Sequence, residues 1–258
     1  MIEEMESPVP DNRWQADSLR FTLFPTIGLA PPQSSWWARI VGDEPETSVS
    51  QPRQGTLIES GAYAGQQLTL AIQANRLDWT VTPSEESQQS EGPPSIGPFA
   101  ERLEGFVRLI HTWFSSPSCP KAKRLAFGAG LIQNVPDRAT GYRRLQPFLK
   151  AVSLDPDRSS DFVYQINRPR NSKRMASGLK LNRLSKWMVA IWSRALVLEP
   201  ALTSNPIIRT QKHFSQRLEL DISTDQEFQA EFAPSDAAQI FSELVDLGIE
   251  ISINGDIP

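Results

Sequence analysis

The sequence contains few of the residues on which metal sites and disulfides depend. It has one cysteine, Cys119, and two histidines, His111 and His213. A single cysteine excludes a disulfide within the chain, and a zinc site needs clustered cysteine and histidine at short spacing. We therefore expect no metal and no cofactor.

Several motifs of catalysis and nucleotide binding are also missing. There is no Gly-Lys dipeptide, hence no Walker A loop, and no Gly-x-Ser-x-Gly elbow. No lysine follows an acidic residue by two positions, as a PD-(D/E)xK nuclease site needs. Gly128 and Gly130 begin a dinucleotide fingerprint, but its third position is Gln133. Two glycines in a strand more often indicate close packing.

The sequence offers one cysteine for nucleophilic chemistry, and its candidate base is His111. Lys121 and Lys123 lie close to Cys119 in the chain and would favour its thiolate form. A lone cysteine in a loop is nevertheless more often a packing residue. We predict no catalytic residue in this chain.

Long apolar runs are absent as well. No run approaches the roughly 18 residues that a membrane-spanning helix needs, so we expect no membrane contact. Residues 1–14 are acidic and lack the apolar core of a secretory signal. We therefore expect a soluble, cytoplasmic protein.

Acidic residues are scarce in the middle of the chain. Residues 1–104 hold 15 acidic and 6 basic residues, residues 105–217 hold 5 and 20, and residues 218–258 hold 10 and none. The net charge of −4 therefore hides a middle segment of +15. Such a segment could bind an external polyanion, or its own acidic flanks could neutralise it in the fold.

The basic residues are most concentrated in residues 161–194, where no acidic residue follows Asp161. We predict that seven of them form a binding surface: Arg168, Arg170, Lys173, Arg174, Lys180, Arg183 and Lys186. The first four lie in a loop of Pro, Asn, Ser and Gly, from which side chains can reach a phosphate backbone. In the competing interpretation these residues lie buried against Asp and Glu of the C-terminal segment.

Periodicity predicts a β-rich N-terminal part over residues 1–82. Residues 19–24 read as a strand, residues 55–82 as a meander, and Trp36 and Trp37 as core anchors. Residues 83–98 are rich in Ser, Gln, Glu and Pro, which predicts a flexible loop. An α+β part, residues 99–258, follows this loop, and we expect one compact domain overall.

The α+β part begins with a helix over residues 99–114, whose apolar residues recur every three or four positions. We expect strands at 124–135, 161–167, 214–222 and 249–253, and helices at 138–152, interrupted or kinked at Pro147, and at 234–247, ended by Gly248. Residues 179–198 fit a helical stripe through Leu184, Trp187 and Ile191. We therefore predict a short strand that runs into a helix there.

This irregular alternation of strands and helices favours an α+β fold. We predict an antiparallel or mixed sheet with helices packed on one face. The pentapeptide NRLDW at 75–79 is echoed by NRLSKW at 182–187, which suggests two similar layers.

The C-terminal half resembles a sporadically distributed bacterial family of uncharacterised proteins of about this length. The resemblance rests on RLELDI followed by an acidic loop, a helix and a short strand, and on the strands RLAFGAGLIQNV and FVYQINRPR. It implies a fold and no mechanism.

Two functions from different classes remain open. The first is a non-enzymatic binding or regulatory module of a bacterial intracellular system, whose basic surface engages a nucleic acid or an acidic protein. The alternative is a metal-dependent enzyme for a phosphate-bearing substrate, with Glu219 and Asp221 as ligands facing the basic loop across a cleft. A third possibility is a subunit of a larger assembly that docks through its charged faces.

Overall fold

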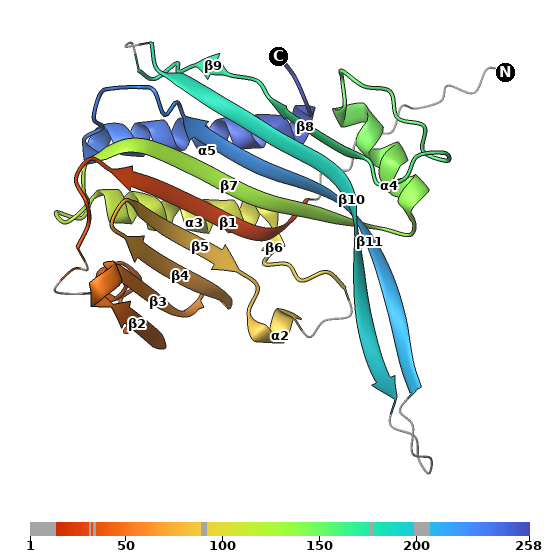
Figure 1. The fold of residues 1–258 in the computed structure, drawn as a ribbon, viewed down its shortest axis with the longest axis horizontal. Coiled ribbons are helices and arrows are strands. Elements are labelled where there is room, and N and C mark those ends of the chain that lie inside the picture. Colours follow the sequence, from red (N-terminus) through yellow and green to blue (C-terminus); the bar gives the residue numbers. More distant parts are fainter. Residues whose placement is uncertain (1–13, 31, 33–34, 89–91, 176–177, 199–206) are drawn as a thin grey trace.

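The computed structural model describes residues 14–258 except 31, 33–34, 89–91, 176–177 and 199–206. Its described strands form one antiparallel sheet of eleven strands in the order β2-β3-β4-β5-β1-β7-β11-β10-β8, with β6 beside β1 and β9 beside β10 (Figure 1). The helices α3 and α5 lie along one face of this sheet (Figure 1). The predicted α+β class with helices on one face is confirmed.

The first half of the chain forms one side of the sheet. Ser35 caps the short helix α1 by accepting a hydrogen bond from the Ala38 amide at 3.0 Å. The predicted strand, meander and long helix are all present. The elements are β1 (Gln15–Pro25), α1 (Trp36–Val41), β2 (Thr47–Gln51), η1 (Pro52–Gln54), β3 (Thr56–Tyr63), β4 (Gln66–Gln73), β5 (Arg76–Thr82), α2 (Glu85–Gln88), β6 (Gly97–Pro98) and α3 (Phe99–Phe114).

The second half forms the other side. Asp137 caps α4 by accepting a hydrogen bond from the Thr140 amide, and a 3₁₀ turn replaces the α-helix at Pro147, where an interruption or kink was predicted. The elements are β7 (Ala122–Val135), α4 (Arg138–Leu145), η2 (Gln146–Phe148), β8 (Val163–Asn167), β9 (Arg170–Asn171), β10 (Lys180–Leu198), β11 (Ile207–Thr224) and α5 (Pro234–Asn254).

The two halves follow the same plan. Each begins with a central strand and a short helix, adds strands from the sheet edge inward, and ends with a long helix. The central strands β1 and β7 pair with Phe21 opposite Phe127, so the similar parts lie side by side in one sheet. The NRL echo falls on β5 and β10, which hold different places in the two halves. It therefore does not trace this repeat.

The core lies between the sheet and the two long helices. Phe21 of β1 meets Phe114 of α3 and Phe241 of α5 edge-on, with ring centroids 5.3 and 5.0 Å apart. Burying one such side chain stabilises the fold by about 1.5–3 kcal/mol. Trp36 and Trp37 are buried as predicted.

The predicted helix within residues 179–198 is wrong, because the whole segment is the strand β10. Trp187 is fully buried on the helix-covered face, whereas Trp192 lies five positions later on the opposite face. Apolar residues occur on both faces of this strand, and taken together they recur at the three- and four-residue spacing of a helical stripe. The segment is a strand because it pairs with β8 and β11, and its β-branched and aromatic side chains are of the types that strands favour.

The predicted C-terminal strand at 249–253 is also wrong, because α5 continues to Asn254. Gly248 does not end the helix. It lies against Phe127, where an added Cβ would be 2.8 Å from a ring carbon. Ile251 and Ser252 are buried, and the Ser252 carbonyl accepts a hydrogen bond from the Trp14 indole at 3.0 Å.

Gly130 gives a stability prediction. A Cβ at this position would overlap the carboxylate of Asp17 and lie 2.8 Å from its Cγ, and that carboxylate pairs with Arg217. We expect Gly130→Ala to lower the free energy of unfolding by about 1–3 kcal/mol. Gly105→Ala is the control, since the space around this position of α3 is open. It should raise the free energy of unfolding by about 0.5–1 kcal/mol. Urea denaturation measures both, and equal effects would contradict the packing argument.

Candidate functional site

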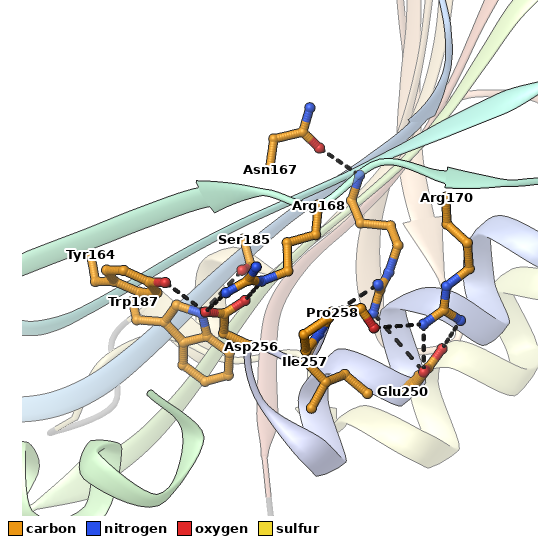
Figure 2. Close-up of polar contacts among 11 residues, drawn as sticks. Tyr164, Asn167, Arg168, Arg170, Ser185, Trp187, Glu250, Asp256, Ile257 and Pro258 are labelled. Carbon is orange, nitrogen blue, oxygen red and sulfur yellow. Dashed lines mark hydrogen bonds and ion pairs between the residues drawn. The ribbon is translucent and has the colours of Figure 1, made fainter. Parts of the chain in front are cut away.

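Arg168 lies in a cluster of charged residues beside the C-terminal segment. Its guanidinium binds both carboxylate oxygens of Asp256, and one of these two bonds, from Nη2, measures 2.9 Å. The hydroxyl of Tyr164 donates to the same carboxylate at 2.5 Å (Figure 2). The Asp256 side chain is 1% exposed. Hydrogen bonds from Arg168 hold the pKa of Asp256 below its usual range.

Gly255 makes this contact possible. It has a φ of 77°, and an added Cβ would overlap the carbonyl of Phe148. That carbonyl also accepts a hydrogen bond from the Asp256 amide at 2.8 Å. The chain therefore turns sharply after α5 and brings Asp256 back towards β8.

Arg170 forms the second ion pair of the cluster. Its two terminal nitrogens bind the carboxylate of Glu250 in α5 at 2.9 and 3.1 Å (Figure 2). Burial raises the pKa of Glu250, but the hydrogen bonds from Arg170 and the positive charges of Arg170, Arg183 and Lys173 together outweigh it and lower the pKa overall. Both side chains are about three-quarters buried. This geometry is the two-pronged contact that arginine makes with carboxylates.

The loop after Arg170 is also held by acidic residues of α5. The Glu243 carboxylate is buried and accepts hydrogen bonds from the Ser172 hydroxyl at 2.5 Å and the Lys173 amide at 2.6 Å. Arg174 pairs with Asp246 at 2.7 Å, in a more exposed position. The basic loop is therefore fixed to α5 through backbone and side-chain contacts.

Arg183 of β10 is the most deeply buried cation of the cluster, with a side chain that is 1% exposed. Its Nη1 donates to the carbonyl of Ile257 at 3.3 Å. Nε and Nη2 have no hydrogen-bond partner among the described residues, and Nη2 is 4.0 Å from Glu250. Burial, followed by the neighbouring charge of Arg170, lowers the pKa of Arg183.

Five of the seven residues that were predicted to form a basic surface therefore lie beside carboxylates in the structure. Arg168, Arg170, Arg174 and Arg183 lie against acidic residues of α5 and the C-terminal segment, and Lys186 pairs with Glu219 at 3.2 Å. Lys173 and Lys180 are exposed, and their ammonium groups form no ion pair among the described residues. The competing interpretation, internal neutralisation, describes most of this cluster.

Glu219 and Asp221, the candidate metal ligands, line a hollow of about 420 Å³ on the other face of the sheet. Glu219 accepts hydrogen bonds from Arg217 at 2.9 Å and Lys186 at 3.2 Å, and these outweigh the effect of burial and lower its pKa. Asp221 is 3.9 Å from Arg20. The hollow does not contain the loop 168–174, and no acidic, histidine or cysteine cluster among the described residues could hold a metal.

The first half contains a similar ion pair. Arg76 and Asp78 pair across two positions of β5, at 2.6 Å, and β5 holds the place in the first half that β11 holds in the second. Salt links of this kind are therefore a structural feature of both halves.

Cys119 is buried, and burial raises the pKa of its thiol to about 12. The basic neighbours do not produce a thiolate. His111 interacts with Ser242 at 3.0 Å through Nε2. Neither residue has the environment of a reactive pair.

The residues that sequence reasoning missed lie on an extended hairpin. Beyond β7 and β8, residues 192–198 of β10 pair only with residues 207–213 of β11, and we call these two segments the ribbon. The ribbon extends away from the body of the protein (Figure 1). The first half closes the equivalent hairpin, β4–β5, directly after the pair Gln73–Arg76.

The ribbon is cationic. It carries Arg194, Arg209 and Lys212 and has no acidic residue. Lys212 and its neighbour Gln211 are exposed, and Ile191 at the root is 45% exposed. The apolar residues 195–198 and the pair Ile207 and Ile208, on either side of residues 199–206, were the available signal, and assigning a helix to the first segment concealed it.

No protein-family model matches the sequence, and no curated protein matches it. The resemblance to a bacterial family therefore stays a prediction. None of the described helices is long and apolar enough to span a membrane.

Proposed function

We propose that this protein is a non-enzymatic binding module that engages a nucleic acid through the ribbon. The proposal rests on one observation: two paired strands leave the sheet and carry three cations without a carboxylate. It keeps the predicted anionic partner but moves the contact from the loop 168–174 to residues 192–198 and 207–213. It assumes a cytoplasmic protein in a bacterial cell.

The dimensions of the ribbon suit a nucleic-acid groove. Its seven residue pairs span on the order of 20 Å at about 3.4 Å per residue. The major groove of a DNA duplex is about 12 Å wide and admits a two-stranded β-ribbon. Arginine and lysine along such a ribbon would contact phosphates and release counterions.

The end of the ribbon adds an apolar element. In the register of the two strands, Val197 lies opposite Ile208 and Leu198 lies opposite Ile207. In the major groove, apolar side chains contact the methyl group of thymine. A two-stranded hairpin alone is marginally stable in water, so contact with a partner would also stabilise these pairs.

We expect labelled duplex DNA of about twenty base pairs to bind, with affinity falling steeply between about 50 and 300 mM salt. The triple variant Arg194→Ala, Arg209→Ala and Lys212→Ala should lower the slope of log K against log salt by about 2–3, since each phosphate contact contributes about 0.9. Fluorescence anisotropy measures this slope, and single strands and duplex RNA provide parallel titrations.

The control removes the same charge elsewhere. Arg53, Lys123 and Lys150 are exposed and lie outside β10 and β11, so their triple alanine variant should keep the wild-type slope. Equal loss in both variants would mean non-specific attraction and would overturn the ribbon proposal. Wild-type protein that binds no nucleic acid at low salt would also overturn it and would favour an acidic protein as the partner.

A further inference from the structure

The charged cluster around Arg183 contains more cations than anions. Arg168 reaches it from the segment between β8 and β9, Arg170 reaches it from β9, and Arg183 reaches it from β10. Glu250 and Asp256 are the carboxylates that face these three guanidinium groups. Among these five groups the net charge is therefore +1.

Arg183 lacks the contacts that a buried cation normally has. Its side chain is 1% exposed, and two of its three nitrogens have no hydrogen-bond partner among the described residues. Leaving a buried donor without an acceptor costs about 1–3 kcal/mol. An anionic oxygen is the kind of acceptor that these two donors would bind.

Residues 256–258 supply an oxygen that accepts a hydrogen bond from each of the three guanidinium groups. The acceptors are the carboxylate of Asp256, the carbonyl of Ile257, 3.3 Å from Arg183, and the carbonyl of Pro258, 3.4 Å from Arg170 (Figure 2). They come from three consecutive residues outside any helix or strand.

We propose that Arg168, Arg170 and Arg183 form a binding site for a phosphate group, and that residues 256–258 occupy this site in the structure. Asp256 is the internal substitute for the ligand. When these residues leave, three guanidinium groups and Glu250 remain, with a net charge of +2. A phosphate group carries about −1.5 to −2 at neutral pH and has the oxygens that guanidinium forks bind.

This site is independent of the ribbon and of its proposed function. The ligand is either inorganic phosphate or the phosphate of a small ester such as a nucleoside monophosphate. Titrations with each of these two compounds distinguish the sources.

The test is thermal unfolding in phosphate, with sodium chloride keeping the ionic strength constant. Phosphate should raise the melting temperature of the wild-type protein above its value in chloride, because a ligand of the folded state stabilises it. Asp256→Asn removes the competing charge and should increase the apparent phosphate affinity at least about tenfold, which corresponds to about 1.4 kcal/mol. Arg183→Met should abolish the phosphate effect in both backgrounds.

Two controls keep the outcome clear. Arg143→Met removes an exposed arginine that pairs with Asp157, and it should leave the phosphate effect unchanged. The ribbon triple variant should also keep it, which separates a failure here from a failure of the nucleic-acid proposal. If Asp256→Asn does not fold, phosphorus NMR of the wild-type and Arg183→Met proteins decides the question. A phosphate effect equal to that of chloride, or one that survives in Arg183→Met, would overturn the proposal.

Discussion

Arg168→Met is expected to destabilise the protein severely, because it leaves the Asp256 carboxylate buried without its arginine. The hydroxyl of Tyr164 would then be the one side-chain hydrogen-bond donor left to this carboxylate among the described residues, and Arg183 would act on it only through its charge. The Asp256 side chain is 1% exposed. Leaving a buried carboxylate without its cation costs about 3–5 kcal/mol. Urea denaturation, analysed with a constant m-value, measures the loss.

Arg183→Met is expected to behave differently although Arg183 is the more deeply buried residue. Its Nε and Nη2 have no partner among the described residues, and Glu250 keeps both hydrogen bonds from Arg170 without it. Replacing a poorly paired buried charge by an apolar side chain of similar volume is often neutral or stabilising. We expect a change of less than about 1 kcal/mol. Equal losses in the two variants would contradict the pairing seen in the cluster.

The pH dependence gives a second measurement of the Arg168–Asp256 pair. The pKa of Asp256 is lowered in the folded protein by Arg168, so its unfolded state binds a proton more readily. The stabilisation is fully present above the unfolded pKa of about 4 and is lost as the pH falls through the lower folded pKa. Wild-type stability should therefore fall below about pH 4, and Arg168→Met should show a smaller fall.

Local patterns predicted the first half of the fold well. The helix over residues 99–114 was confirmed at both ends, because its apolar stripe faces one continuous core. The meander of β3, β4 and β5 was also confirmed, since short turns join strands that are neighbours in the sheet. In these elements the residues that pair or pack are close in sequence, so propensity and tertiary structure agree.

Long-range pairing explains the elements that were missed. β10 is a strand because it pairs with β11 and β8, and neither partner can be identified from the periodicity of β10 alone. Ile249, Ile251 and Ile253 alternate like a strand, but Trp14, more than two hundred residues away, binds the end of the helix that contains them. Tertiary contacts override local pattern in both segments.

The charge map predicted the location of the cluster but could not assign its partners. The sequence shows a basic middle segment and an acidic C-terminal segment. One interpretation required these two segments to lie close together, and the other required the basic segment to face outward. Only the turn at Gly255 brings Asp256 to Arg168. The register of β10 determines which cations extend past the sheet, so the ribbon could not be separated from the loop in advance.

Removing the ribbon is expected to abolish nucleic-acid binding while the body of the protein remains folded. The variant replaces residues 193–212 by Asn-Gly, so that Trp192 and His213, which are register partners, are joined by a two-residue turn. It copies the short β4–β5 hairpin of the first half, which closes between Gln73 and Arg76. We expect affinity for duplex DNA at about 100 mM salt to fall more than about a hundredfold, because all three ribbon cations and the apolar end are lost.

The same variant should keep its stability, since residues 193–198 and 207–212 pair only with one another among the described residues. A two-stranded hairpin contributes little by itself, so the free energy of unfolding should change by less than about 2 kcal/mol. Phosphate should still raise the melting temperature of this variant, because Arg183 and its neighbours are unchanged. DNA binding that persists in this variant would place the contact on Lys173, Lys180 or the sheet face. Binding of the wild-type protein to anionic lipid vesicles but to no nucleic acid would assign the ribbon a membrane surface as its partner.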